Sequence, residues 1–301
     1  MPLSGISDII FTLINNVQAR PDCNVIISRC EAYDFLSESK SEIESITAKY
    51  YEIIATSSKY TGYTADITLA DIFDRITDSF GEASAILGSV TSVSTNSAPT
   101  GASSVDTDTI AGETTSNSGD SSNASTNIDV VGLAVFKGDV LVGELTAMES
   151  LCHLIVINDM EECILSIPSP FDENAIIDLY VTYEEDTKNN VELINGSPLI
   201  STNIKLNAKV LSASRTSNYF EEDNLKMVEE YANSYIKYEV ESYLYKMSKE
   251  YGADIDLFGR YAVKYFSTWD EWMDYNWLEN FSDAFFKVET EVDVVSSYLI
   301  S

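Results

Sequence analysis

The chain has a single histidine, so any catalysis that needs an imidazole would have to use His153. This residue lies between the apolar Leu151 and Leu154, and a single histidine is too few ligands to indicate a metal site. No Gly-x-Ser-x-Gly elbow or other nucleophile motif is present to complete a Ser-His-Asp or Cys-His arrangement. We therefore predict that His153 is a structural residue.

Neighbouring carboxylates are a second source of chemistry, because two converging acids can hydrolyse a glycosidic bond. Glu161 is followed by Glu162, and Asp270 by Glu271. Adjacent side chains on a helix or strand do not converge on one substrate. In a chain with 49 acidic residues such pairs also arise by chance, so the pattern favours acids on a solvated face.

Metal and phosphate sites are not indicated either. Asp254 and Asp256 match two early acids of a calcium loop, but Phe258 occupies the fifth position, where the loop needs an oxygen ligand. No glycine-rich phosphate loop is present. The cysteines form no C-x2-C pair and leave the redox compartment open: Cys23, Cys30, Cys152 and Cys163. We predict no catalytic residue, no cofactor and no metal.

Aromatic side chains gather near the C-terminal end of the chain: Tyr261, Tyr265, Phe266, Trp269, Trp272, Tyr275, Trp277, Phe281, Phe285 and Phe286. A sugar-binding platform has a similar composition, which leaves open a secreted or surface carbohydrate-binding or glycan-hydrolysing protein. The helical spacings of Tyr261 with Tyr265, and of Trp269 with Trp272, favour a packed core instead. Rings left exposed would offer a surface for a partner.

Charge excludes several function classes. The 301 residues include 18 Lys and Arg against 49 Asp and Glu, a formal net charge of −31. Such a surface repels phosphate backbones and anionic lipid headgroups, so we exclude nucleic acid and charge-driven membrane binding. No apolar run reaches the roughly 18 residues that a membrane-spanning helix needs. The beginning of the sequence does not read as a secretory signal.

A change of composition divides the chain. Of the 38 residues from 91 to 128, 18 are Ser or Thr, and none is Lys, Arg or aromatic. Such a stretch has too little apolar surface to offset its ordering entropy, so we predict a disordered insertion over 91–128. It separates 1–90, a helix-strand-helix segment that looks incomplete, from a larger domain at 129–301.

Periodicity predicts the elements of the first segment. Ser4 is a possible cap for a helix over 6–14, followed by a strand over 23–28 and helices over 32–36 and 43–54. Thr68 and Asp71 form a near capping box for a helix over 69–76. A final strand is predicted over 83–87.

The second segment reads as strands with one long helix. A hairpin is predicted over 130–143 with Gly138 and Asp139 as its turn, then a helix over 145–152. Further strands are predicted over 163–167, 175–181, 191–194, 199–210 and 285–295, and shorter helical structure follows Gly259. An amphipathic helix spans about 221–251 and ends at Gly252. The fold class is α+β, with mixed, antiparallel-rich sheets packed by helices.

Ordered motifs of this second segment resemble a known family. The stretch GLAVFKGDVLVGEL from Gly132 to Leu145 is similar to an opening motif G-x-A-V-F-K-x-D-x-L-V-G-x-L. YGADIDLFG ends at Gly259 and is followed by Tyr265, Trp269, the Asn276-Trp277 pair and Phe281, as in the closing motif. The family is the Ger(x)C lipoproteins, the C subunits of the nutrient-germinant receptors of spore-forming bacteria. The segments GISDII, ARPD and EAYDFL of the first ninety residues are similar to the middle of its N-terminal region.

The resemblance implies a non-enzymatic receptor subunit at the outer face of the spore inner membrane, assembled with integral-membrane subunits and contributing to nutrient-triggered germination. Family members begin with a lipoprotein signal and a lipid-bearing cysteine. Neither is found here, so the resemblance implies a chain whose start has been lost and whose full-length form reaches the membrane through that lipid. Its motif residues are the candidates for interaction: Phe136, Gly143, Asp254, Gly259, Trp269, Trp272, Asn276, Trp277 and Phe281.

Overall fold

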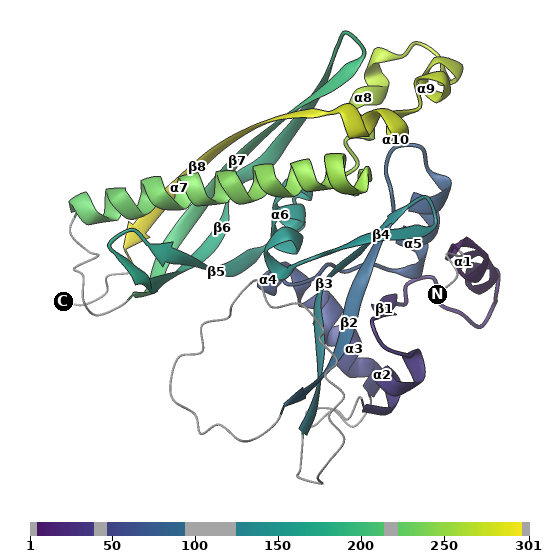
Figure 1. The fold of residues 1–301 in the computed structure, drawn as a ribbon, viewed down its shortest axis with the longest axis horizontal. Helices are drawn as coiled ribbons and strands as arrows, with labels where there is room; N and C mark the ends of the chain where they lie inside the picture. The colour runs from purple at the N-terminus through teal and green to yellow at the C-terminus, as the bar shows by residue number, and fades with distance from the viewer. Residues whose placement is uncertain (1–4, 39–46, 94–124, 214–221, 297–301) are drawn as a thin grey trace.

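The computed structural model describes residues 5–38, 47–93, 125–213 and 222–296. Within these ranges the chain forms two four-stranded sheets with helices packed on them (Figure 1). Each sheet is mixed, with antiparallel pairs and one parallel pair at an edge. The predicted α+β class is confirmed.

The first sheet has the strand order β1-β2-β3-β4, made by β1 (Ile26–Ser28), β2 (Ser84–Val93), β3 (Ser125–Lys137) and β4 (Val140–Leu145). β1 runs parallel to β2, and the other neighbours are antiparallel. The helices before β2 are α1 (Ser7–Ile14), α2 (Ala32–Glu38), α3 (Thr47–Thr56), α4 (Ser58–Thr61) and α5 (Leu69–Thr77).

The second sheet has the order β5-β6-β7-β8, made by β5 (Glu162–Ser169), β6 (Asp172–Ile194), β7 (Ser197–Ala213) and β8 (Phe285–Ser296). α7 (Glu222–Tyr245) lies along one face of this sheet (Figure 1). The helix buries an apolar stripe because Val228, Ala232, Ile236, Val240 and Leu244 recur every four residues.

One helix lies between the two sheets. α6 (Ala147–Ile157) contacts strands of both sheets and also α7, and every residue from Ser150 to Val156 is buried. A capping box starts it, in which Thr146 accepts from the Glu149 backbone N–H and the Glu149 carboxylate accepts from the Thr146 N–H. The two sheets therefore share one apolar core.

Short helices form the end of the molecule that faces the β6–β7 turn (Figure 1). They are a π-helical turn (Lys246–Tyr251), α8 (Gly259–Ala262), a 3-10 turn (Val263–Tyr265), α9 (Trp269–Tyr275), α10 (Trp277–Asn280) and a second 3-10 turn (Phe281–Asp283). The Tyr275 hydroxyl donates to the Gly196 carbonyl at 2.9 Å and ties α9 to the tip of that hairpin.

Several local predictions are confirmed. Thr68 and Asp71 form a complete capping box at the start of α5. Gly138, with φ of 60°, turns the hairpin between β3 and β4. Gly252, with φ of 59°, ends the long helix, whose last turn is π-helical. The predicted Ser4 cap lies outside the described residues.

The strand predicted over 83–87 continues to Val93, and the helix predicted to end at 152 continues to Ile157. Two other predicted boundaries are wrong in a way that changes the elements. The strands predicted over 175–181 and 191–194 are one strand, β6, because the polar stretch between them still pairs with β7 through an irregular register. Leu145 ends β4 instead of starting the next helix, since Thr146 caps that helix and it begins at Ala147.

Strands from both sides of the Ser/Thr-rich segment build the first sheet. β2 pairs with β3 as far as Val93 and Ser125, so β3 and β4 belong to the same sheet as β1 and β2. Residues 94–124 lie outside the described part of the chain. The division into 1–90, 91–128 and 129–301 stays a prediction.

Candidate functional site

The family-motif candidates separate into two groups in the structure. One group is buried, most of it where the segment before β2 meets the short helices near the C-terminal end: Phe136, Asp254, Gly259, Trp272, Trp277 and Phe281. Trp269 and Asn276 are exposed on the outer side of the same helices. Gly143 lies in β4, under the ring of Tyr251.

Asp254 is the centre of the buried group. Its side chain is 1% exposed, and its carboxylate accepts from Trp277 Nε1 at 2.8 Å, from the Gly259 N–H at 3.0 Å and from the Phe258 N–H at 3.2 Å. Leu257, inside the loop closed by these bonds, has a left-handed φ of 62°. One carboxylate therefore fixes the conformation of the loop and connects it to Trp277.

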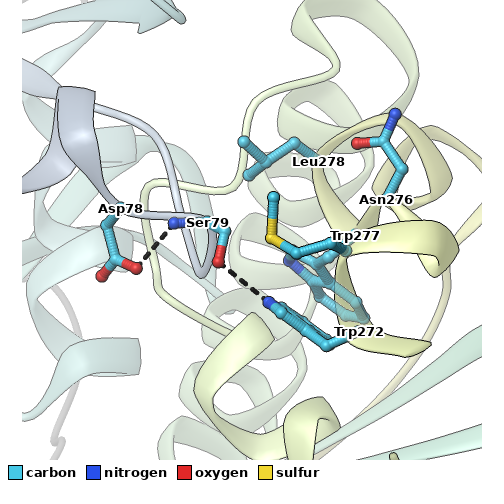
Figure 2. Close-up of a pocket in the computed structure, with 7 residues that line it drawn as sticks. Asp78, Ser79, Trp272, Asn276, Trp277 and Leu278 are labelled. Atoms are coloured by element: carbon cyan, nitrogen blue, oxygen red, sulfur yellow. Dashed lines mark hydrogen bonds between the residues drawn. The ribbon is translucent and has the colours of Figure 1, made fainter. Parts of the chain in front are cut away.

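Stacked aromatic rings surround this carboxylate. The ring centroids of Trp277 and Trp272 are 6.1 Å apart, with an interplanar angle of 20°. The ring centroid of Phe281 is also 6.1 Å from that of Trp277. The Trp272 indole N–H donates to Ser79 Oγ at 2.9 Å, which Figure 2 shows as a dashed line. Asn276, in the left-handed region with φ of 51°, ends α9 and lets the chain reverse into Trp277.

The first sheet docks on this cluster through backbone contacts. The Glu82 N–H donates to the Asp254 carbonyl at 2.7 Å. A Cβ atom added to Gly259 would lie 2.4 Å from the Phe80 carbonyl oxygen, and one added to Gly81 would lie 2.8 Å from the Asp254 carbonyl oxygen. Both glycines are needed because the two chain segments pass so close to one another.

Two buried carboxyl groups at this junction have perturbed acidity. Burial raises the pKa of Asp254 to about 7, and the nearby charge of Asp256 raises it further. The hydrogen bonds from the three N–H donors lower this pKa, but by less than burial raises it. Burial also raises the pKa of Glu82 to about 7. Two groups lower this pKa by less: the Gly138 N–H, which donates to the carboxylate at 2.7 Å, and the positive charge of Lys137.

These raised pKa values make the stability depend on pH. In an unfolded chain Asp and Glu titrate near pH 4, so between about pH 4 and 7 the folded protein holds protons that the unfolded chain has released. The stabilisation is complete below about pH 4 and is lost as the pH rises through 7. The junction is therefore less stable above neutral pH than below it.

We expect Glu82→Gln to raise the melting temperature at pH 8 by about 2–4 °C and to leave it nearly unchanged at pH 4. The amide keeps the acceptor for the Gly138 N–H and removes the cost of burying a charge. Thermal unfolding followed by circular dichroism at both pH values would measure this, with the exposed Glu250→Gln as the matched control. An equal shift at both pH values would contradict the titration of Glu82.

A second buried polar cluster involves the single histidine. His153 Nδ1 lies 2.7 Å from Asp256 Oδ1, and the Tyr243 hydroxyl donates to both Asp256 oxygens at 2.9 and 3.0 Å. Burial raises the pKa of the neighbouring Cys152 thiol well above its usual value, so this sulfur stays protonated. The cluster connects α6, α7 and the Asp254 loop.

Sequence reasoning missed the partner of His153. Asp256 and His153 are 103 residues apart, and no local signal relates them. Within the described ranges, no group of three or more His, Cys, Asp or Glu side chains is placed to hold a metal ion. The predicted structural role of His153 is consistent with its burial and its bonds.

The outer side of the junction has a small pocket and exposed apolar side chains. The pocket has a volume of about 180 Å³ and is lined by Asp78, Ser79, Trp272, Met273, Asn276, Trp277 and Leu278 (Figure 2). Beside it, Trp269 is 56% exposed and Met273 51% exposed. The ring of Phe80 contacts Trp269 edge-on, with centroids 5.8 Å apart.

The core assignment of the aromatic cluster is therefore only partly right. Trp272, Trp277 and Phe281 are core residues, whereas Tyr261, Tyr265 and Trp269 are more than a third exposed. Trp269 begins α9 at the rim, and the side chain that inserts beneath the helix is Trp272. A sugar platform would need free ring faces, and the rings of Trp272 and Trp277 are stacked on one another and buried.

Comparisons with known proteins identify a family and a solved structure with a similar fold. Residues 131–298 match the family model described as "Spore germination B3/ GerAC like, C-terminal", and residues 3–92 match "Spore germination protein N-terminal domain". A solved structure titled "Crystal Structure of the GerBC protein" is similar with a TM-score of 0.62 and 14% identity, covering 97% of this chain and 75% of that one. No curated protein matches the chain.

Proposed function

The chain belongs to the GerAC-like family of spore germination proteins, and from this premise we propose that it acts as a non-enzymatic subunit of a nutrient-germinant receptor. The observation that carries the proposal is the extent of the family match. It covers the second sheet, α7 and the Asp254 loop with its short helices, and a second model covers residues 3–92, which contribute Ser79, Gly81 and Glu82 to the junction. The role in spore germination follows from membership.

The chemistry of the junction supports a structural role for its polar groups. The carboxylate of Asp254 accepts three N–H groups, and Asp256 bonds His153 and Tyr243. These groups hold segments of the fold together, and none of the four side chains is among those that line the pocket. A rigid scaffold that presents a surface is what a receptor subunit requires.

We place this subunit at the outer face of the spore inner membrane, in a complex with integral-membrane subunits. The described residues contain no helix that is both long and apolar enough to cross a bilayer. With a net charge of −31, the chain gains no electrostatic attraction to anionic lipids. We infer that attachment comes from an N-terminal lipid, as in the family that the sequence resembles, or from the partner subunits.

Deletion of the gene tests the proposal. We expect spores of the deletion strain to lose the response to at least one nutrient germinant, measured as the fall in absorbance that accompanies germination. A copy of the gene at another locus restores the response. Unchanged germination with every nutrient to which the parent strain responds would overturn the proposed function.

A further inference from the structure

The outer side of the junction combines features of a protein-binding surface. Trp269 and Met273 are four residues apart on α9, so they lie on one face of that helix, and both are about half exposed. Met273 also lines the pocket. Trp and Met are enriched at protein interfaces, and binding energy concentrates where an apolar side chain enters a pocket. We name Trp269, Met273 and the pocket the anchor surface.

The size of the pocket limits its occupant. Its volume of about 180 Å³ is below the roughly 300 Å³ at which small-molecule sites begin. It is similar to a cavity of about 150 Å³ that holds a benzene molecule. The pocket therefore has room for one apolar side chain of a partner. The lining also includes the polar residues Asp78, Ser79 and Asn276.

The charge around the anchor surface selects the partner. Residues 270–284 include five acids and no Lys or Arg. Asp270 and Asp274 are exposed on α9 beside Trp269 and Met273, and Asp78 lines the pocket. A second copy of this chain would bring another −31 charges and be repelled. A partner with Lys or Arg near its apolar side chain would be attracted.

We propose that the anchor surface binds a segment of a partner protein in which one apolar side chain, flanked by Lys or Arg, enters the pocket. The apolar side chain packs against Met273 and Leu278, while the basic residues face Asp78, Asp270 and Asp274. The inference rests on the proposed function only in taking the partner to be another subunit of the receptor.

Synthetic peptides test the surface directly. The probe is a fluorescein-labelled ten-residue peptide with a central Leu flanked on each side by two Lys. One comparison peptide has Ala in place of Leu, and another has Glu in place of Lys. Fluorescence anisotropy with the full chain should show binding of the probe, at least about 10-fold weaker binding of the Ala peptide, and no binding of the Glu peptide. Added salt should weaken binding of the probe.

Substitutions of exposed residues test whether the probe binds at the anchor surface. We expect Trp269→Ala and Met273→Ala each to weaken probe binding about 10-fold, with an unchanged melting temperature. Tyr238→Ala, which removes a 66% exposed ring from α7, should have no effect. Asp274→Asn should weaken binding and reduce its salt dependence, whereas the exposed Asp293→Asn on β8 should not.

Three results would overturn the anchor surface: no binding of the probe, equal binding of the Leu and Ala peptides, or binding that Trp269→Ala and Met273→Ala leave unchanged. These results are independent of the germination assay. A deletion strain that loses its nutrient response while the purified chain ignores the peptides would retain the proposed function and reject the surface.

Discussion

Replacing Trp277 with alanine is expected to lower the free energy of unfolding by about 3–5 kcal/mol, the largest effect that we predict for a single side chain. Trp277 is 1% exposed and packs between Trp272 and Phe281. Its removal leaves a large cavity among these rings. It also removes the indole N–H from the buried Asp254 carboxylate, which adds the cost of a lost charged hydrogen bond.

Urea unfolding of the full chain measures this loss, and two further variants separate its causes. Trp277→Phe keeps much of the ring volume and removes the hydrogen bond, so it should cost less than alanine but more than about 1 kcal/mol. Trp269→Ala, at the 56% exposed tryptophan of the same segment, should cost less than about 1 kcal/mol. A loss below about 1 kcal/mol for Trp277→Ala would contradict its place in the core.

The features that sequence predicts well are local. A helix start needs only a residue and its third neighbour, as with Thr68 and Asp71, and a helix end needs only a residue that accepts a left-handed φ, as at Gly252. The turn at Gly138 is also local, because it needs only a residue that accepts a left-handed φ. In each case the residues that determine the structure are adjacent in the chain, so their pattern is visible without knowledge of the fold.

The candidate site depends on contacts that cross the chain. Trp272 donates to Ser79 across 193 residues, and Asp254 accepts from Trp277 across 23. Composition cannot say which of 49 acids are buried, because burial is decided by packing between the sheets. The family resemblance did select Asp254, Gly259 and Trp277. The structure supplies the physical reason, since all three hold one loop against the first sheet.

Replacing Gly259 with alanine is expected to cost about 2–3 kcal/mol, although alanine is the better helix former at the start of α8. The new Cβ atom would lie 2.4 Å from the Phe80 carbonyl oxygen and 2.8 Å from Trp277 Cδ1. The first of these is a backbone atom, so the clash is relieved only if the segment before β2 moves away from the Asp254 loop.

Gly138→Ala is the control that separates this clash from a general intolerance of alanine. Gly138 has a left-handed φ of 60° with nothing near its added Cβ, so alanine there should cost only the backbone penalty of about 1–2 kcal/mol. Because Phe80 contacts both Trp269 and Trp272, a displaced Phe80 should also weaken binding of the Leu peptide to the anchor surface. If Gly259→Ala unfolds in urea at the wild-type midpoint, the close approach of the two segments is wrong. If it is destabilised but binds the peptide normally, the anchor surface does not depend on how the first sheet docks.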